Sequence, residues 1–380
     1  MKAGMAKQSR FWSRLLVMSH ALPHVLFGRR KPSQPQRILI AHHLLLGDTI
    51  MLAGLFKKLR RDYSTAQIDA LVPAAWLPIF AGQPYGVRGL AYDPRAVDSQ
   101  TRLISEGPYD WALVPADNRW AWIARAMGAR WVTAFAGGGG GIKDWPADEF
   151  IDWPQSPAAW GDIASGLAPG AEPAPFILGE WPAPPLPANA PALPQAPYAV
   201  LHLGASSPHK MWLPERWLAL AAALSAAGLT VVWSGGPNEK GLAAAVDPQG
   251  RYANLAGQFN MAGLWHLMAG AALLVSPDTG VAHLARLTGT PAVVLFGPGS
   301  PIVSGPGRFW QNSPFAVVWE KNIECRNQNL LFERPLPWVR HCWRSVAECG
   351  KPRCMWAIEN QQVMQAIEHV TGMTLVKERT

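Results

Sequence analysis

The sequence predicts an α/β protein with two doubly wound domains, each built around its own parallel sheet. Two stretches, residues 37–72 and 198–233, each run from an apolar strand through a polar loop and an amphipathic helix to a second strand. This order is the pattern of a βαβ unit, which occurs in parallel sheets. A length of 380 residues also favours two domains over one.

The first βαβ unit begins with the apolar strand 38–41 and a loop that ends in Gly47 and Asp48. The residues that follow place apolar side chains at the spacing of one helix face: Leu52, Leu55, Phe56 and Leu59. Strand 68–72 completes the unit. A later strand, 131–135, precedes five glycines, Gly137 to Gly141, which predict either a mobile cleft loop or a plain surface loop.

The second βαβ unit repeats this order. Strand 198–203 leads to a helix that starts at Pro214, with Gly228 where a left-handed C-terminal cap is expected. Strand 229–233 follows, and apolar runs at 271–275 and 292–296 predict further strands. A helical pattern formed by Val363, Ile367 and Val370 ends the chain. Before this unit, residues 181–197 are rich in proline and almost uncharged, which predicts a stiff linker outside any core.

The composition restricts the class of protein. Apolar residues make up 49% of the chain and charged residues only 16%, yet no run of 18 uncharged apolar residues predicts a spanning helix. The net charge of +8, with basic clusters at 29–31 and 57–61, indicates an anionic partner. A membrane surface and a phosphorylated substrate both fit. Nucleic acid is disfavoured because no nucleic-acid-binding module accompanies the charge.

The N-terminal segment, residues 1–36, mixes apolar and basic residues. It is a poor signal peptide, because charged and proline residues interrupt the apolar region and no small-residue cleavage site follows. Two interpretations remain: a segment that lies on a membrane surface, and a plain helix packed on its domain. Either interpretation predicts a cytoplasmic protein, in the first case peripheral on the inner face of the membrane.

Four cysteines fall in the last part of the chain: Cys325, Cys342, Cys349 and Cys354. They form no CxxC pair, and a cytoplasmic location argues against disulfides. We therefore expect reduced thiols and no metal. A structural zinc or iron ion is the minor alternative, because thiolates gathered in a short span suit these metals.

Polar loops lie where ligands bind an open parallel sheet, outside the carboxyl ends of the strands. The loop "GASSPHK" offers Ser206, Ser207 and Lys210, a set that suits phosphate oxygens, although a solvated loop lysine fits as well. The loop "SGGPNE" contains Glu239, which could accept hydrogen bonds from ribose hydroxyls; this signal is weak alone.

The loop "SPDTG" carries a stronger signal. If Asp278 caps the next helix, the first N–H groups of Thr279 and Gly280 suit a phosphate. Asp278 would repel a diphosphate and is better used on sugar hydroxyls, while His283 lies on the same helix face as Thr279. The alternative is that Asp278 only caps and His283 only packs.

Asp48 is the acid of the first polar loop, "LLLGD". A carboxylate there suits a general base, which contributes roughly 10² to 10⁴ in rate. The alternative that the residues alone favour is an N-cap for the following helix.

Taken in order, these loops resemble the signature segments of the ADP-heptose:lipopolysaccharide heptosyltransferases, glycosyltransferase family nine. The segments are "ILIAHHLLLGDTIMLAGLFKKLR", "LHLGASSPHKMWLPERW", "VVWSGGPNE" and "LVSPDTGVAHLARLTGTPAVVLFGPGSP", and the cysteine-bearing tail "CMWAI" also matches. The resemblance implies a GT-B fold, with two Rossmann-like domains facing each other across a cleft. The expected organisation is the segment 1–36, an acceptor domain 37–180, the linker 181–197, a nucleotide-sugar domain 198–355 and a helix 356–380 that crosses back to the N-terminal domain.

The resemblance also implies an inverting enzyme that transfers a heptose from ADP-heptose to a lipopolysaccharide core or a similar glycan. Asp48 resembles the catalytic base. Two further sets are carried over: Ser206, Ser207, Lys210, Thr279 and Gly280 for the diphosphate, and Glu239, Asp278 and His283 for the sugar and ribose. No cofactor is required by this mechanism, and Mg²⁺ would at most stimulate it.

Two positions depart from the family pattern. His42 stands where the family commonly has an arginine, and "KMWLP" carries one residue more than the usual motif. Three alternatives therefore stay open: a protein O-heptosyltransferase, a nucleotide-sugar epimerase of the same architecture, and a non-catalytic assembly protein.

Overall fold

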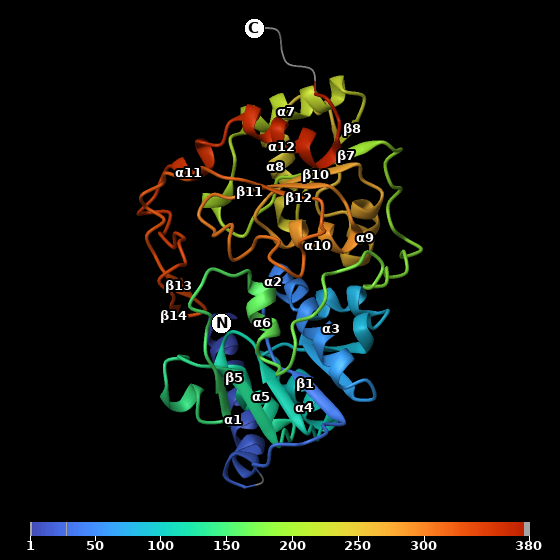
Figure 1. Ribbon diagram of the computed structural model, residues 1–380. Helices are drawn as coiled ribbons and strands as arrows, with labels where there is room; N and C mark the ends of the chain where they lie inside the picture. The colour runs from blue at the N-terminus through green and yellow to red at the C-terminus, as the bar shows by residue number, and fades with distance from the viewer. Residues whose placement is uncertain (1, 28, 376–380) are drawn as a thin grey trace. The chain divides into compact units, whose positions relative to one another are not determined.

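The computed structural model describes residues 2–27 and 29–375 of the chain (Figure 1). It divides into two compact units. The N-terminal unit comprises Met1–Ser156, Trp160–Ala174 and Leu330–Pro337, and the C-terminal unit comprises Pro157–Ala159, Pro175–Asn329 and Trp338–Thr380.

The N-terminal unit is built on a six-stranded parallel sheet with the order β3-β2-β1-β4-β5-β6. Its strands are β1 Arg37–Ile40, β2 Gln67–Val72, β3 Val87–Ala91, β4 Trp111–Val114, β5 Trp131–Phe135 and β6 Glu149–Ile151. The order reverses between β1 and β4. This reversal is the topological switch point at which open α/β sheets bind ligands.

The C-terminal unit repeats the same winding, with the parallel order β12-β11-β10-β7-β8-β9. Its strands are β7 Tyr198–His202, β8 Thr230–Ser234, β9 Ala253–Asn254, β10 Leu273–Pro277, β11 Ala292–Leu295 and β12 Phe315–Val318. Here the order reverses between β7 and β10. The predicted fold class, two doubly wound parallel sheets, is confirmed.

Helices follow most strands of the N-terminal unit: α2 Leu46–Met51, α3 Ala53–Asp62, α4 Val97–Glu106, α5 Ala121–Ala126 and α6 Trp160–Ser165, with short 3-10 turns η1 Ala74–Phe80, η2 Pro84–Gly86, η3 Asn118–Trp120 and η4 Gly141–Lys143. Helix α1, Lys2–Leu26, packs on α4 and α5. A buried stripe at i, i+4 spacing makes this contact: Ser13, Val17, Ala21 and Val25.

The helices of the C-terminal unit are α7 Pro214–Ala226, α8 Lys240–Val246, α9 Met261–Ala269, α10 Gly280–Thr288, α11 Arg353–Trp356 and α12 Asn360–Thr371, with turns η5 Pro208–Lys210 and η6 Pro237–Glu239. Helix α7 starts at Pro214 as predicted. Gly228, with φ of +88°, ends it in the left-handed conformation that glycine favours.

The apolar face of α12 packs on β11, β12 and α7, and Val363 and Ile367 are fully buried in the core of the C-terminal unit. A crossing of residues 356–380 to the N-terminal domain stays a prediction. The hairpin β13 Leu330–Leu331 and β14 Arg334–Pro335 belongs to the N-terminal unit.

The boundary between the units lies after Ala174 and not at residue 180. Phe176 packs on Trp310, with ring centroids 4.7 Å apart, and Trp181 is buried. The ring nitrogen Nε2 of His266 lies 2.7 Å from the carbonyl oxygen of Pro184. The expectation that 181–197 lies outside any core is therefore wrong for Trp181. Burial of its large indole ring is favourable, and this draws the start of the segment into the C-terminal unit.

Candidate functional site

Two of the predicted loops meet at the switch point of the C-terminal unit. Lys210 follows β7 and Asp278 follows β10, the two strands between which the order reverses. The Nζ atom of Lys210 donates to the main-chain carbonyl of Asp278 at 2.7 Å and to its carboxylate Oδ2 at 3.0 Å. The sequence therefore predicted correctly that these loops lie at one edge of the sheet.

Helix α10 begins at Gly280, with Thr279 at the N-cap position. The expectation that Asp278 caps this helix is wrong, because its carboxylate is turned to Lys210. The hydroxyl oxygen of Thr279 is buried and has no hydrogen-bond partner within the described chain. An unpaired hydroxyl beside the free N–H groups of a helix start is an arrangement that suits an anion.

Glu239 joins a third loop to this edge. Its carboxylate Oε2 accepts a hydrogen bond from the Gly236 N–H at 2.6 Å. The same oxygen lies so close to Gly204 that a Cβ built there would be 1.8 Å away. The carboxylate of Glu239 thus lies directly against the loop that carries Lys210.

The two serines differ in exposure. Ser206 is exposed, whereas Ser207 is half-buried and its hydroxyl accepts from the His209 N–H at 3.3 Å. Ser207 therefore also serves as the cap of the turn η5. A role of either serine in phosphate binding stays a prediction.

His283 is buried, and its Nδ1 lies 3.2 Å from a guanidinium nitrogen of Arg286. Burial, with Arg286 and Lys210 nearby, holds the pKa of His283 well below its usual value, so the imidazole is neutral. Burial lowers the pKa of Arg286 to about 9, and its guanidinium lies 3.9 Å from the ring centroid of Phe315. Sequence reasoning missed Arg286, although its spacing of three residues from His283 places it on the same helix face.

Asp48 lies in the first turn of α2, after β1 and thus at the switch point of the N-terminal unit. Leu45 occupies the N-cap position, so the alternative that Asp48 is the cap is wrong. Asp48 is half-buried, and its main-chain carbonyl accepts a hydrogen bond from the indole N–H of Trp160 at 3.2 Å.

His42 ends the same strand region and is fully buried. Its Nδ1 accepts from the Leu44 N–H at 3.2 Å, and its Nε2 has no partner among the residues that the structure describes. Burial lowers the pKa of His42 to about 3, and the neighbouring His43 adds to the shift. A neutral imidazole therefore stands at the position where the resembling family commonly has a cation.

The glycine run follows β5 as predicted. Four of its five residues have positive φ, with values between 65° and 92°. The N–H of Gly140 donates to the carboxylate of Asp144 at 2.9 Å. Glycine is therefore required by the backbone of this loop, and a role in binding stays a prediction.

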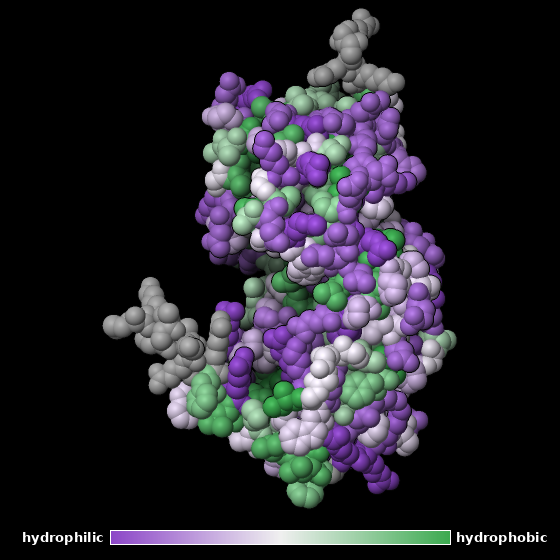
Figure 2. All heavy atoms as spheres, turned by 90° about the vertical axis from the view of Figure 1, so that its left-hand side faces the viewer, coloured by the Kyte–Doolittle hydropathy of each residue, from purple (hydrophilic) through white to green (hydrophobic). Residues whose placement is uncertain are grey.

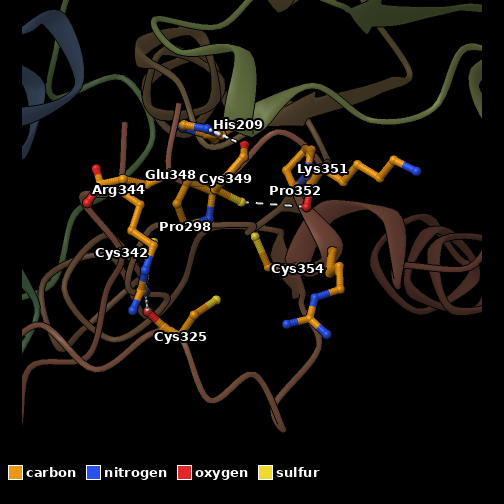
Figure 3. Close-up of a pocket in the computed structure, with 11 residues that line it drawn as sticks. His209, Pro298, Cys325, Cys342, Arg344, Glu348, Cys349, Lys351, Pro352 and Cys354 are labelled. Carbon is orange, nitrogen blue, oxygen red and sulfur yellow. Dashed lines mark hydrogen bonds between the residues drawn. The ribbon is translucent and has the colours of Figure 1, made fainter. Parts of the chain in front are cut away.

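All four cysteines line one cavity of about 270 Å³ in the C-terminal unit (Figure 3). Arg344 lies 3.7 Å from the Cys342 sulfur, and His209 Nε2 lies 3.0 Å from the Cys349 carbonyl oxygen. Burial raises the pKa of the Cys354 thiol. Within residues 2–27 and 29–375, no three His, Cys, Asp or Glu side chains are arranged to hold a metal ion.

Buried histidines predict acid sensitivity. Burial lowers the pKa of His202 from 6.5 to about 4. Between these two pH values His202 is therefore neutral in the folded chain but protonated in the unfolded chain. Stability should therefore fall as the pH falls from about 6.5 towards 4, and His42 should act in the same direction. We expect urea unfolding of His202→Asn to depend less on pH in this window than unfolding of the wild type. If the stability of His202→Asn and of the wild type depended equally on pH, buried His202 would not be a source of the acid sensitivity.

Comparison with known proteins gives a consistent result. Residues 184–329 match the model of "Glycosyltransferase family 9 (heptosyltransferase)". Lipopolysaccharide heptosyltransferase 1 of Escherichia coli K12 is 29% identical over 114 residues, which are 29% of this chain and 35% of that protein. The chain thus aligns with about a third of the length of the curated relatives that it matches.

Two solved structures show the same fold over most of the chain. The family 9 glycosyltransferase of Veillonella parvula DSM 2008 has a TM-score of 0.67 at 16% identity, covering 89% of this chain and 98% of that chain. The ADP-heptose lipopolysaccharide heptosyltransferase II of E. coli has a TM-score of 0.66 at 18% identity, covering 88% of this chain and 98% of that chain. At these identities the likeness concerns the fold.

Proposed function

We propose that this chain is an inverting glycosyltransferase of family 9 that moves a heptose from ADP-heptose to a hydroxyl group of a lipopolysaccharide core or a similar glycan. The observation that carries this proposal is the pairing of Lys210 with Asp278 at the switch point of the C-terminal unit.

The pairing brings the chemistry for a nucleotide sugar into one place. Lys210 supplies a cation, and Thr279 and the start of α10 supply hydrogen-bond donors, for the diphosphate. When no ligand is bound, the carboxylate of Asp278 neutralises the charge of Lys210. With a donor bound, the same carboxylate can accept hydrogen bonds from sugar hydroxyls. Glu239, whose carboxylate lies against the same loop, is proposed to accept hydrogen bonds from the ribose hydroxyls.

In the proposed reaction an acceptor hydroxyl loses its proton to Asp48 while its oxygen attacks the anomeric carbon of the heptose. The bond from that carbon to the diphosphate breaks in the same step, and ADP leaves with the electron pair. Lys210, Thr279 and the N–H groups of α10 stabilise the charge that grows on ADP. A single displacement inverts the anomeric configuration and needs no covalent intermediate.

The test combines binding and turnover. ADP at 100 times its dissociation constant should stabilise the protein by about 2.7 kcal/mol, measured by thermal shift against UDP and GDP. ADP-heptose and a lipopolysaccharide core acceptor should then give ADP and a glycan that is heavier by one heptose.

Other results would support other functions. Preference for UDP would overturn the ADP-heptose assignment, and turnover of the donor without acceptor would indicate an epimerase. Transfer to a protein but not to a glycan would make the enzyme a protein O-heptosyltransferase. If the protein bound no nucleotide, the remaining interpretation would be a non-catalytic assembly protein.

Helix α1 supports a peripheral contact with the membrane. Its outer face exposes Phe11, Trp12 and Leu15 at 48–61%, with the exposed Arg14 between them. Figure 2 shows hydrophobic side chains, in green, on the surface of the N-terminal unit. In the described part of the chain, no helix has the length and apolar character needed to span a membrane. A basic, aromatic face of this kind suits the surface of an anionic bilayer.

We therefore expect the Phe11→Ser, Trp12→Ser and Leu15→Ser triple variant to lose most of its binding to vesicles that contain anionic lipid. The matched control is Ile177→Ser with Leu178→Ser, two exposed apolar residues of the C-terminal unit. Co-sedimentation with vesicles measures both. Equal binding of the triple variant and the wild type would contradict a membrane role of α1.

A further inference from the structure

The hairpin β13–β14 has a strained turn. Leu331 pairs with Arg334, and the two residues between them, Phe332 and Glu333, have φ values of 48° and 68°. A two-residue turn of this form usually contains Asn-Gly, because left-handed backbone is unfavourable for other residues. Strain of this kind persists only where the surroundings fix it, and it occurs mostly at functional sites.

Arg334 fixes the hairpin to the N-terminal unit. It is buried, and its guanidinium donates to the carbonyls of Ala116 at 2.5 Å and Ala136 at 2.7 Å, and to the Asn118 side-chain oxygen at 2.8 Å. Ala116 itself has a φ of 69°. These partners follow β4 and β5, so the hairpin lies at the carboxyl edge of the sheet, beside the ends of these two strands.

One aromatic contact links the hairpin to Asp48. The ring of Phe332 lies on Trp160, with centroids 4.6 Å apart. Trp160 is fully buried, and its indole N–H donates to the Asp48 carbonyl. Helix α2, which carries Asp48, has six residues and no side-chain cap. Its position therefore depends on partners such as Trp160.

We propose that Trp160 and Phe332 are positioning residues that hold Asp48 in place for the reaction, with the hairpin as their support. The inference rests on the proposed function, in which Asp48 is the base. Proton transfer requires the base within about 3 Å of the acceptor hydroxyl, and small displacements are costly.

The chain offers a matched control. Trp153 and Trp160 stack with centroids 6.3 Å apart, and each indole donates one hydrogen bond to a main-chain carbonyl. The acceptor is Ala136 for Trp153 and Asp48 for Trp160. Replacing either residue by phenylalanine removes one N–H and keeps an aromatic ring.

Trp160→Phe should lower kcat at least fivefold and leave the donor KM unchanged, whereas Trp153→Phe should keep kcat within twofold of the wild type. Phe332→Tyr should retain the activity that Phe332→Ala loses. Equal kcat values for the two tryptophan variants would overturn the inference, provided that thermal melting shows both folded.

Hydrogen exchange gives a readout that is independent of activity. Amides of residues 45–52 should exchange faster in Trp160→Phe and Phe332→Ala than in Trp153→Phe. If the wild-type protein transferred no heptose, the proposed function would be overturned. The exchange experiment would still show whether Trp160 and Phe332 hold α2 in place. Unchanged exchange in all three variants would overturn that support.

Discussion

Asp48→Ala is expected to lower turnover at least about a hundredfold while the affinity for ADP stays nearly intact. Asp48 lies in the N-terminal unit, whereas the groups proposed to bind ADP lie on loops of the C-terminal unit. The loss should therefore appear in kcat with acceptor present. Steady-state kinetics and calorimetric titration with ADP measure the two quantities.

The control for this variant is Asp98→Asn. Asp98 also lies in the first turn of a helix of the N-terminal unit, α4, but it is exposed at the surface. The Asp98→Asn variant should leave kcat unchanged. Asp48→Asn, in contrast, should behave like Asp48→Ala, because an amide cannot accept the proton. Near-normal turnover of both Asp48 variants would remove Asp48 from the mechanism.

Local patterns predicted the sheets well. Strand β5 has the predicted bounds, β7 and β11 each end one residue earlier than predicted, and β8 is shifted by one residue along the chain. Apolar runs in parallel sheets are buried on both faces, so their signal is strong. The polar loops after β7 and β10 were also assigned to the correct edge, because strand direction alone determines that edge.

Contacts between distant residues could not be predicted in this way. The capping prediction for Asp278 failed because Lys210, 68 residues away, binds its carboxylate. Arg334 donates to a carbonyl 218 residues earlier in the chain. No hydrophobic period or turn motif encodes such a pair, since it depends on how whole elements pack.

Lys210→Ala should weaken ADP binding about tenfold to a hundredfold and slow transfer as well. A charge-assisted contact to phosphate contributes about 1.5 to 3 kcal/mol, which corresponds to this range. Calorimetric titration with ADP measures the loss, with Lys240→Ala as the control lysine of the same unit, because it is exposed on α8. Unchanged ADP affinity in Lys210→Ala would contradict a phosphate role.

The salt bridge makes a second variant decisive. Removing Lys210 leaves the carboxylate of Asp278 without its cation, and this side chain, which is 12% exposed, would then repel the diphosphate. The Lys210→Ala and Asp278→Asn double variant should therefore bind ADP more tightly than Lys210→Ala alone, but more weakly than the wild type. If the lysine only neutralises Asp278, the double variant should regain full ADP affinity. If the lysine contacts phosphate directly, part of the loss should remain, and this difference separates the two roles of Lys210.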